Sequence, residues 1–438
     1  MIALVLAAVL TLQPCEVRDV KAQCGTLAVP ENPSRRATRF IDLNLVVVPA
    51  RSKHNDALFI LAGGPGGGAT NMTSWAVRTF GAGERDIVLV DMRGTGRSNP
   101  LRCDDPPRLY DDLFEPSRLA ACRDKLAAKA DLTQYTTLHA VRDLEAVRKA
   151  LGYRTMTLYG TSYGTRVAQE YMRRHPKSIR AAILDGVVPP SLVMPTRYAE
   201  GAQRSLARVL ALCKADEACH IAYPELEGDL AKVLREAEDG VTIDGETLPR
   251  GLFGEAFRNF LYSPEAYTKL PHALHAAAAG DWAPLGEMAQ RYARNIRTID
   301  LGLFLSVTCA EDLPRVDEAA VRKGATGTVL GTYRLDQQLG ACRVWPRATS
   351  DAAMAKPVRS SIPTLIVSGE LDPVTPPEYG DEVARTLRRS LHVVIPSGSH
   401  SGDTGGCQEQ VLSEFVREGS VDALDVTCMP KVKRPPFR

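Results

Sequence analysis

Residues 158–166 read LYGTSYGTR and place Ser162 between two glycines. A Gly-x-Ser-x-Gly pattern can present a serine hydroxyl for attack on a carbonyl when it lies on a sharp turn between a strand and a helix. The apolar run 156–159 predicts a strand before the serine, and the spacing of apolar residues in 167–172 predicts a helix after it. We therefore interpret Ser162 as a candidate nucleophile. From the pentapeptide alone, the alternative is a turn serine or a helix cap.

Asp372 and His400 could supply the two further groups that a reactive serine needs. A hydroxyl is a weak nucleophile at neutral pH, so it requires a base within hydrogen-bond reach, and a third group must orient that base. Both residues follow predicted strands, 363–368 and 391–395, at the edge where open α/β sheets place ligands. Of the eight histidines, we find only His400 in such a turn. Asp185, at the end of another predicted strand, is a rival acid that we expect to be structural.

The glycine-rich segment GGPGGG at 63–68 could complete such a site. Glycine lets the backbone approach a substrate oxygen without a Cβ in the way, and backbone amides stabilise a developing oxyanion. When the serine lies on a strand-to-helix turn, two backbone amides bind the oxyanion. One belongs to the residue after the serine, and the other belongs to the loop after an early strand. We predict the amides of Tyr163 and Gly64. A phosphate cradle is the alternative, although no GxxxxGK[ST] pattern is present.

Short apolar runs that end in glycine-rich or acidic turns recur along the chain and predict strands buried on both faces. They cover 41–48, 57–62, 86–90, 156–159, 181–184, 363–368 and 391–395. Helical patterns separate them, such as the apolar face within 138–151. This alternation predicts an α/β fold with a mostly parallel, doubly wound sheet. Residues 190–357 are rich in Ala, Leu, Arg and Glu and predict a helical cap, inserted between two core parts, 15–189 and 358–438.

The composition limits the classes of partner and cofactor. A net charge of +2 over 438 residues, without a long block of like charge, argues against nucleic-acid binding. We find no CxxC pattern and no His–Cys cluster with ligand spacing, so we predict no metal, and serine chemistry requires no cofactor. After the N-terminus no stretch approaches the 18 or so apolar residues of a membrane span, and we expect no stable membrane insertion. The oligomeric state stays open.

The N-terminal residues 1–14 read MIALVLAAVLTLQP and predict a signal peptide, because their apolar core is too short to span a bilayer. A basic start is missing, and the alternative is a buried N-terminal strand or helix. Ten cysteines fall into five couples that are close in sequence, which suits an oxidising compartment. We expect a secreted or periplasmic protein. Nearest-neighbour pairing is the simplest of many connectivities, and reduced core cysteines are the alternative. Nearest-neighbour pairing gives the disulfides Cys15–Cys24, Cys103–Cys122, Cys213–Cys219, Cys309–Cys342 and Cys407–Cys428.

Five motifs in their order along the chain resemble the proline iminopeptidase and secreted tripeptidyl aminopeptidase branch of the α/β hydrolases. They are GGPGGG, DMRGTGRS, GTSYGTR, GELDPVTPP and the SGSH turn, and the likeness covers roughly 24–189 and 361–428. The resemblance implies an α/β-hydrolase fold and serine hydrolysis of peptides from a free N-terminus, with Ser162, Asp372 and His400 as the triad. Ala62 stands where the smaller proline iminopeptidases have histidine, which favours the tripeptidyl aminopeptidase type over strict proline specificity.

An enzyme that acts on a free N-terminus needs a carboxylate for the α-ammonium group. Within the predicted cap, the segment 308–312 offers Glu311 and Asp312 beside Cys309, and we predict Glu311 as the anchor with Asp312 next to it. The alternative is a solvated acidic helix end. The expected substrate is a peptide or a small acyl compound. An esterase or other acyl hydrolase, and a catalytically silent binding protein on the same fold, are the alternative functions.

Overall fold

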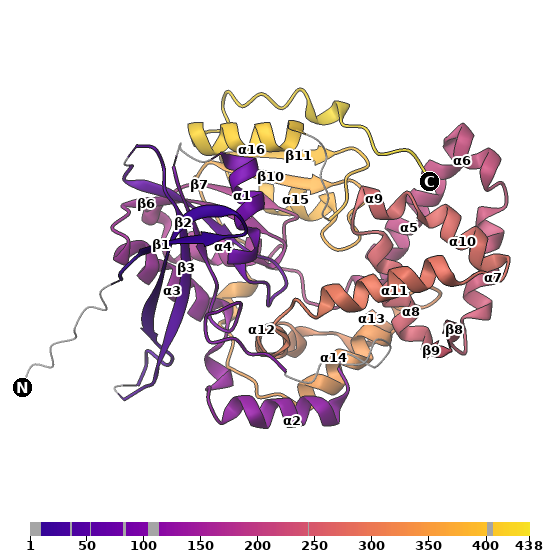
Figure 1. The fold of residues 1–438 in the computed structure, drawn as a ribbon, viewed down its shortest axis with the longest axis horizontal. Helices are drawn as coiled ribbons and strands as arrows, with labels where there is room; N and C mark the ends of the chain where they lie inside the picture. The colour runs from indigo at the N-terminus through magenta and orange to yellow at the C-terminus, as the bar shows by residue number, and fades with distance from the viewer. Residues whose placement is uncertain are drawn as a thin grey trace, which may run out of the picture.

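The computed structural model describes residues 10–35, 37–52, 54–81, 85–103, 114–243, 245–400 and 406–438. Within these ranges a nine-stranded sheet has the order β1-β2-β3-β5-β4-β6-β7-β10-β11 (Figure 1). Its strands are β1 (Gln13–Val17), β2 (Val20–Pro30), β3 (Phe40–Val48), β4 (Asp56–Leu61), β5 (Asp86–Val90), β6 (Thr155–Thr161), β7 (Ile179–Asp185), β10 (Thr364–Gly369) and β11 (Ser390–Ile395). The six strands from β5 to β11 in this order are parallel, and β1, β2 and β3 extend the sheet in antiparallel fashion.

The predicted strands are all present in this sheet, because a strand that is buried on both faces must be apolar along its whole length. Every residue of β4 and β10 is buried. The hairpin of β1 and β2 was not predicted; it reverses at Arg18 and Asp19, both with positive φ. β1 also takes in Gln13 and Pro14, the last residues of the predicted signal peptide, whereas residues 1–9 of that prediction lie outside the described residues.

Helices cover both faces of the sheet (Figure 1). The core helices are α1 (Thr73–Phe80), α2 (Pro116–Ala127), α3 (Thr137–Ala150), α4 (Tyr163–Arg174), α15 (Pro377–Ala384) and α16 (Gly406–Glu418). Apolar side chains of α1 and α16 share one hydrophobic cluster with the sheet, whereas those of α2, α3, α4 and α15 share another. Short 3-10 helices occur at Ala69–Met72, Leu132–Gln134, Pro176–Ser178, Leu313–Arg315, Ala352–Ala355 and Met429–Lys431. None of the helices in the described ranges is long and apolar enough to cross a membrane.

The insertion between β7 and β10 is mainly helical, as predicted. It contains α5 (Tyr198–Ala215), α6 (Glu217–Ala222), α7 (Leu226–Glu236), α8 (Arg250–Phe260), α9 (Pro264–Tyr267), α10 (Leu270–Ala278), α11 (Ala283–Ile296), α12 (Leu301–Glu311), α13 (Glu318–Ala325) and α14 (Tyr333–Val344). A small hairpin, β8 (Val241–Ile243) with β9 (Glu246–Leu248), was not expected.

The insertion is divided between two hydrophobic clusters. Helices α5 to α11, with part of α13, pack around their own apolar core. Helix α12 instead joins the core under the sheet, where Phe304 stacks on Phe114 with ring centroids 5.7 Å apart. The physical reason is that LGLFLSVTCAE is apolar on all sides, and such a helix is stable only when it is buried all round.

All ten cysteines form the expected disulfides. Cys15–Cys24 joins β1 to β2, and Cys309–Cys342 joins α12 to α14. The pairs that are close in sequence are therefore also close in space, with Cα atoms 5.2–5.9 Å apart. The cross-link joins α12 and α14, two helices of the insertion whose cysteines both lie in the hydrophobic core under the sheet.

Candidate active site

Ser162 lies on the turn between β6 and α4, as predicted, with φ 52° and ψ −121°. Few non-glycine residues adopt positive φ, and such strain is typical of functional sites. The flanking glycines are required by space, because a Cβ on Gly160 would lie 2.6 Å from the carbonyl oxygen of Gly164. A Cβ on Gly164 would lie 2.1 Å from the carbonyl oxygen of Leu61. The turn therefore holds the serine in one place above the sheet edge.

Asp372 and His400 meet at the same edge because β10 and β11 are parallel neighbours, so that the turns after them lie side by side. Nδ1 of His400 lies 2.8 Å from Oδ2 of Asp372. The amides of Val374 and Thr375 donate to Oδ1 at 2.7 and 2.8 Å, and the Thr375 hydroxyl donates to Oδ2 at 2.7 Å. An aspartate in this position orients the imidazole and fixes which nitrogen carries the proton.

The ionised form of Asp372 is stabilised despite its burial. Burial is the largest influence on its pKa and raises it, but the charge and hydrogen bond of His400 and the donors of Thr375 together bring the pKa below its ordinary value. A carboxylate only accepts hydrogen bonds, so Nδ1 of His400 carries the proton. The other ring nitrogen, Nε2, is then free to act as a base.

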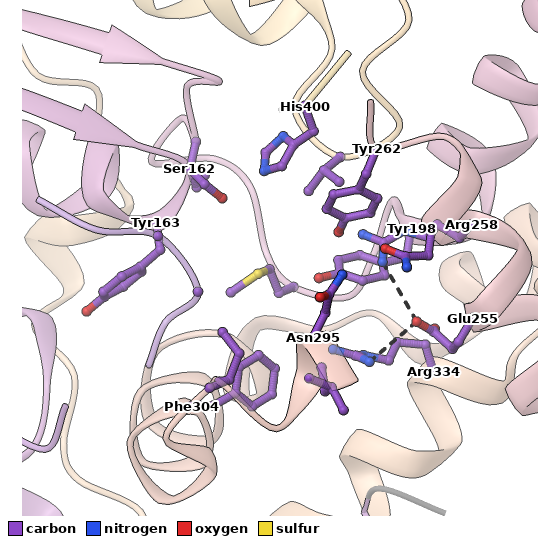
Figure 2. A pocket seen from close by; sticks show the side chains of 18 of the residues that line it. Ser162, Tyr163, Tyr198, Glu255, Arg258, Tyr262, Asn295, Phe304, Arg334 and His400 are labelled. Carbon is purple, nitrogen blue, oxygen red and sulfur yellow. Dashed lines mark ion pairs between the residues drawn. The ribbon is translucent and has the colours of Figure 1, made fainter. Parts of the chain in front are cut away.

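Ser162 and His400 line the same cavity, and their side chains lie next to each other (Figure 2). A Cβ on Gly186, which has φ +62°, would lie 3.4 Å from Cε1 of His400. Glycine at this position therefore leaves room for the imidazole ring. The arrangement brings the predicted serine, histidine and aspartate together in one site.

The glycine-rich loop passes directly over the serine. A Cβ on Gly63 would lie 3.1 Å from that of Ser162, and Gly64 has φ +121°, which glycine adopts readily. Tyr163 is the first residue of α4, so its amide has no acceptor within the helix and lies at the positive end of the helix dipole. The Tyr163 side chain points away from His400 and its hydroxyl contacts Thr137 Oγ1 at 2.8 Å (Figure 2). Only its backbone faces the site.

Asp185, the rival acid, makes a different set of contacts. Its carboxylate accepts a hydrogen bond from the Tyr159 hydroxyl at 2.8 Å, and its carbonyl oxygen accepts one from the Ser162 amide at 2.9 Å. Burial raises the pKa of Asp185 to about 6. Asp185 therefore supports the turn of Ser162, and Asp372 is the residue that contacts His400.

Glu311 and Asp312 do not line the cavity, so the expected ammonium anchor at this position is wrong. Both carboxylates are buried, and Asp312 accepts two hydrogen bonds from Arg166, at 3.1 and 3.0 Å. Glu311 accepts hydrogen bonds from the amide and the hydroxyl of Thr137, both at 2.7 Å. Because α12 is buried all round, its acidic end meets Arg166 inside the protein instead of a substrate.

The turn DMRGTGRS has a structural role. Arg93 is buried and donates to both carboxylate oxygens of Asp143, at 2.6 and 2.7 Å. Asp91 accepts hydrogen bonds from the amide and the hydroxyl of Thr70, both at 3.0 Å. Arg97 is exposed. These contacts fix the loop that follows GGPGGG relative to β5.

The cavity has a volume of about 360 Å³ and is closed by residues of the insertion. Its largely apolar wall includes Val188, Leu192, Val193, Met194, Ile296, Ile299 and Phe304. Its cap side carries Tyr198, Glu255, Arg258, Tyr262, Asn295 and Arg334, on the side opposite Ser162 (Figure 2). Sequence reasoning did not find this polar group. Glu255 and Arg258 stand within GLFGEAFRNF. Charged residues inside such a phenylalanine-rich helical run could have indicated that this helix contributes polar groups to a site.

No group of three or more His, Cys, Asp or Glu residues that could hold a metal ion occurs in the described part of the chain. The fold and the Ser162–His400–Asp372 arrangement define the class of protein, a serine hydrolase with an α/β fold. The chain belongs to the alpha/beta hydrolase fold family, whose model matches residues 56–402.

Individual relatives include both peptidases and an esterase. The chain is 27% identical to serine protease Hip1 of Mycobacterium tuberculosis, over 93% of this chain and 87% of that protein. It is 25% identical to a tripeptidyl aminopeptidase of Streptomyces coelicolor, over 93% and 83%. It is 27% identical to carboxylesterase B of M. tuberculosis, over 93% and 86%. Among solved structures, the proline iminopeptidase of Mycobacterium smegmatis has a TM-score of 0.43 at 15% identity, with 90% of this chain and 98% of that chain covered.

Proposed function

We propose that the protein is an aminopeptidase that cleaves peptides from a free N-terminus through an acyl-enzyme. The observation that carries this proposal is the carboxylate of Glu255 in the wall of the cavity that Ser162 also lines. Glu255 is the one acidic residue among the described residues that line this cavity. Its Oε1 atom is buried and accepts no hydrogen bond from any described residue. A buried, unpaired acceptor of this kind suits an ammonium group.

The mechanism follows from the contacts of the site. Nε2 of His400 accepts the proton of Ser162 as the hydroxyl attacks the carbonyl carbon, while Asp372 holds the imidazole. The amides of Gly64 and Tyr163 donate hydrogen bonds to the oxyanion. His400 then protonates the leaving amine, and a water molecule, activated by the same histidine, releases the acyl group from Ser162.

The names of relatives support peptide substrates, since a serine protease and a tripeptidyl aminopeptidase both match over 93% of the chain. The size of the cavity supports action at a chain end, because its volume of about 360 Å³ limits the part of the substrate that it can hold. Five disulfides support a secreted or periplasmic location, where such bonds persist.

The test compares peptidyl coumarin amides that have a free N-terminus with their N-acetylated forms. We expect kcat/KM for the free forms to be at least about tenfold higher, because acetylation removes the charge that Glu255 would bind. Ser162→Ala should lower kcat by several decades on every substrate, since triad members act as a unit. Equal rates on free and blocked substrates would contradict the aminopeptidase proposal.

An esterase is the second candidate function, and the largely apolar wall of the cavity together with the match to carboxylesterase B favours it. It shares the chemistry of the triad and differs only in the acyl group. Fast hydrolysis of short-chain nitrophenyl esters combined with no cleavage of any free peptide amide would select this function instead.

A further inference from the structure

Two buried arginines share one glutamate on the cap side of the cavity (Figure 2). Arg258 lies one turn after Glu255 on α8, and its Nη1 is 3.7 Å from Glu255 Oε2. Arg334 comes from α14, and its Nη1 is 3.5 Å from the same oxygen. The exposed fractions of the two arginines are 4% and 7%, and that of Glu255 is 2%. Two cations therefore face one anion in a region that contains little water.

Aromatic rings hold the two guanidinium groups in place. Arg258 lies 4.1 Å above the ring of Tyr198 and 5.0 Å from that of Tyr262. Arg334 lies 5.3 Å from Tyr198 and 4.9 Å from Phe114. Such contacts orient the planar guanidinium but leave the N–H groups in its plane unused. The aromatic contacts therefore fix the orientation of both guanidinium groups at the wall of the cavity.

Several of these donors lack an acceptor. Within the described residues, nothing accepts a hydrogen bond from Nε or Nη2 of Arg258, or from Nε of Arg334. Buried polar groups without a partner are rare, because each destabilises the fold unless a ligand or water satisfies it. The charges of the other two arginines that line the cavity are balanced: Arg166 is paired with Asp312, and Arg197 is exposed beside Glu200. The excess positive charge thus belongs to Arg258 and Arg334.

We propose that Arg258 and Arg334 form a carboxylate-binding subsite, which takes an acidic side chain of the substrate's acyl portion, as in an N-terminal Glu or Asp residue. An arginine pair with free N–H groups matches the two oxygens of a carboxylate. The placement of that side chain rests on the proposed function, because the same residue's α-ammonium would bind Oε1 of Glu255. An ammonium alone would add a cation to a cluster that is already positive, whereas a substrate carboxylate balances it.

The first experiment compares substrates that differ in charge and hardly in shape. Tripeptidyl coumarin amides carry Glu or Gln at one position and Ala at the others, alongside Glu and Gln aminoacyl coumarin amides. We expect one position at which kcat/KM for Glu exceeds that for Gln by about tenfold or more. A ratio near one in every member of the series would overturn the proposal.

Variants test whether the arginines cause the preference. In Arg258→Gln and Arg334→Gln the Glu-to-Gln ratio should fall toward one, whereas Arg235→Gln, an exposed arginine of α7, should leave the ratio at the wild-type value. A ratio that survives in both pocket variants would overturn the proposal. If a pocket variant does not fold, the wild-type protein still decides the question: L-glutamate should inhibit with a Ki at least about tenfold below that of L-glutamine. Equal Ki values would overturn it.

N-acetylated Glu and Gln substrates separate this proposal from the aminopeptidase proposal. If acetylation has no effect on rates but the Glu-to-Gln ratio persists, the subsite stands and the aminopeptidase proposal fails. If free N-termini are required but Glu and Gln substrates react equally, the aminopeptidase stands and the subsite fails.

Discussion

The ring of Tyr262 packs edge-on against the imidazole of His400, with centroids 5.3 Å apart and ring planes at 79°. Tyr262 belongs to the insertion, just after α8, whereas His400 follows β11 of the sheet. Two hydrogen bonds reinforce the contact: Ser399 Oγ donates to the carbonyl oxygen of Leu261, and the Tyr267 hydroxyl donates to that of Ser397 at 2.8 Å. The cap therefore supports the loop that carries His400.

This contact predicts that a change in the cap alters the chemical step. Tyr262→Ala removes the ring beside His400, and we expect kcat to fall about tenfold to hundredfold, because small displacements of a catalytic group are costly. Tyr262→Phe keeps the ring and is the matched control. Steady-state kinetics on one coumarin amide measures both variants. If Tyr262→Phe lost as much activity as Tyr262→Ala, the hydroxyl and not the packing would be responsible.

The turn at Ser162 predicts that replacing Gly164 by alanine destabilises the protein, whereas the same replacement at Gly228 does not. Gly164→Ala would put a Cβ 2.1 Å from the Leu61 carbonyl oxygen, and we expect the free energy of unfolding to fall by about 3 kcal/mol, with loss of fluorophosphonate labelling. Gly228→Ala is the control, because nothing lies within 4 Å of its Cβ position on α7, and helix propensity favours Ala by up to about 1 kcal/mol. Urea denaturation compares the two. Equal stability would mean that β4 adjusts to the added methyl group.

The burial of Asp312 predicts that removing its ion-pair partner, Arg166, strongly lowers the free energy of unfolding. In Arg166→Met a buried carboxylate loses its ion pair, and we expect a loss of about 3–5 kcal/mol of unfolding free energy. Arg197→Met breaks the exposed pair with Glu200, 3.3 Å apart, and should cost at most about 1 kcal/mol. Chemical denaturation gives both values. Similar losses would show that the pair of Arg166 and Asp312 is not the stabilising element that its burial indicates.

Glu311 predicts a pH dependence of stability. Burial is the largest influence and raises the pKa of Glu311 from 4.5 to about 7, although Arg166 and Thr137 favour the ionised form. Between these two pH values the folded protein retains a proton that the unfolded chain releases. The contribution of Glu311 is thus fully present below pH 4.5 and is lost as the pH rises through 7.

Glu311→Gln removes this titration while an amide oxygen can still accept the hydrogen bond of Thr137. Relative to the variant, the wild type should lose about 1–3 kcal/mol between pH 4.5 and pH 8, measured by urea denaturation at each pH. The difference between the two proteins isolates this one group from all others that titrate. A difference that is constant with pH would contradict the raised pKa.

The placement of Ser162, Asp372 and His400 in one site was predictable because its determinants are local. Ser162 needs two glycines on a strand-to-helix turn, and both the glycines and the apolar strand are visible in the sequence. Asp372 and His400 follow β10 and β11, which are short and mainly apolar, so their turns could be assigned to one edge of a parallel sheet. The disulfides were predictable for the same reason, since their partners are separated by only 6 to 33 positions.

The residues of the cap that line the cavity could not be predicted from the sequence. Glu311 and Glu255 both stand in helical runs of the insertion, and nothing in their local sequence says which one faces the cavity. The first ends a helix that the sheet domain buries completely, and the second lies on a helix whose polar group is turned toward Ser162.

The sequence by itself determined the fold class and the turns that carry Ser162, Asp372 and His400, because short-range patterns of apolar residues, glycines and turns specify them. Only the tertiary structure decided that Arg166 neutralises Asp312 and that Arg258, Arg334 and Glu255 form the cap side of the cavity. Those assignments depend on which faces of distant helices pack together, and this is set by the sum of many long-range contacts that no local pattern records.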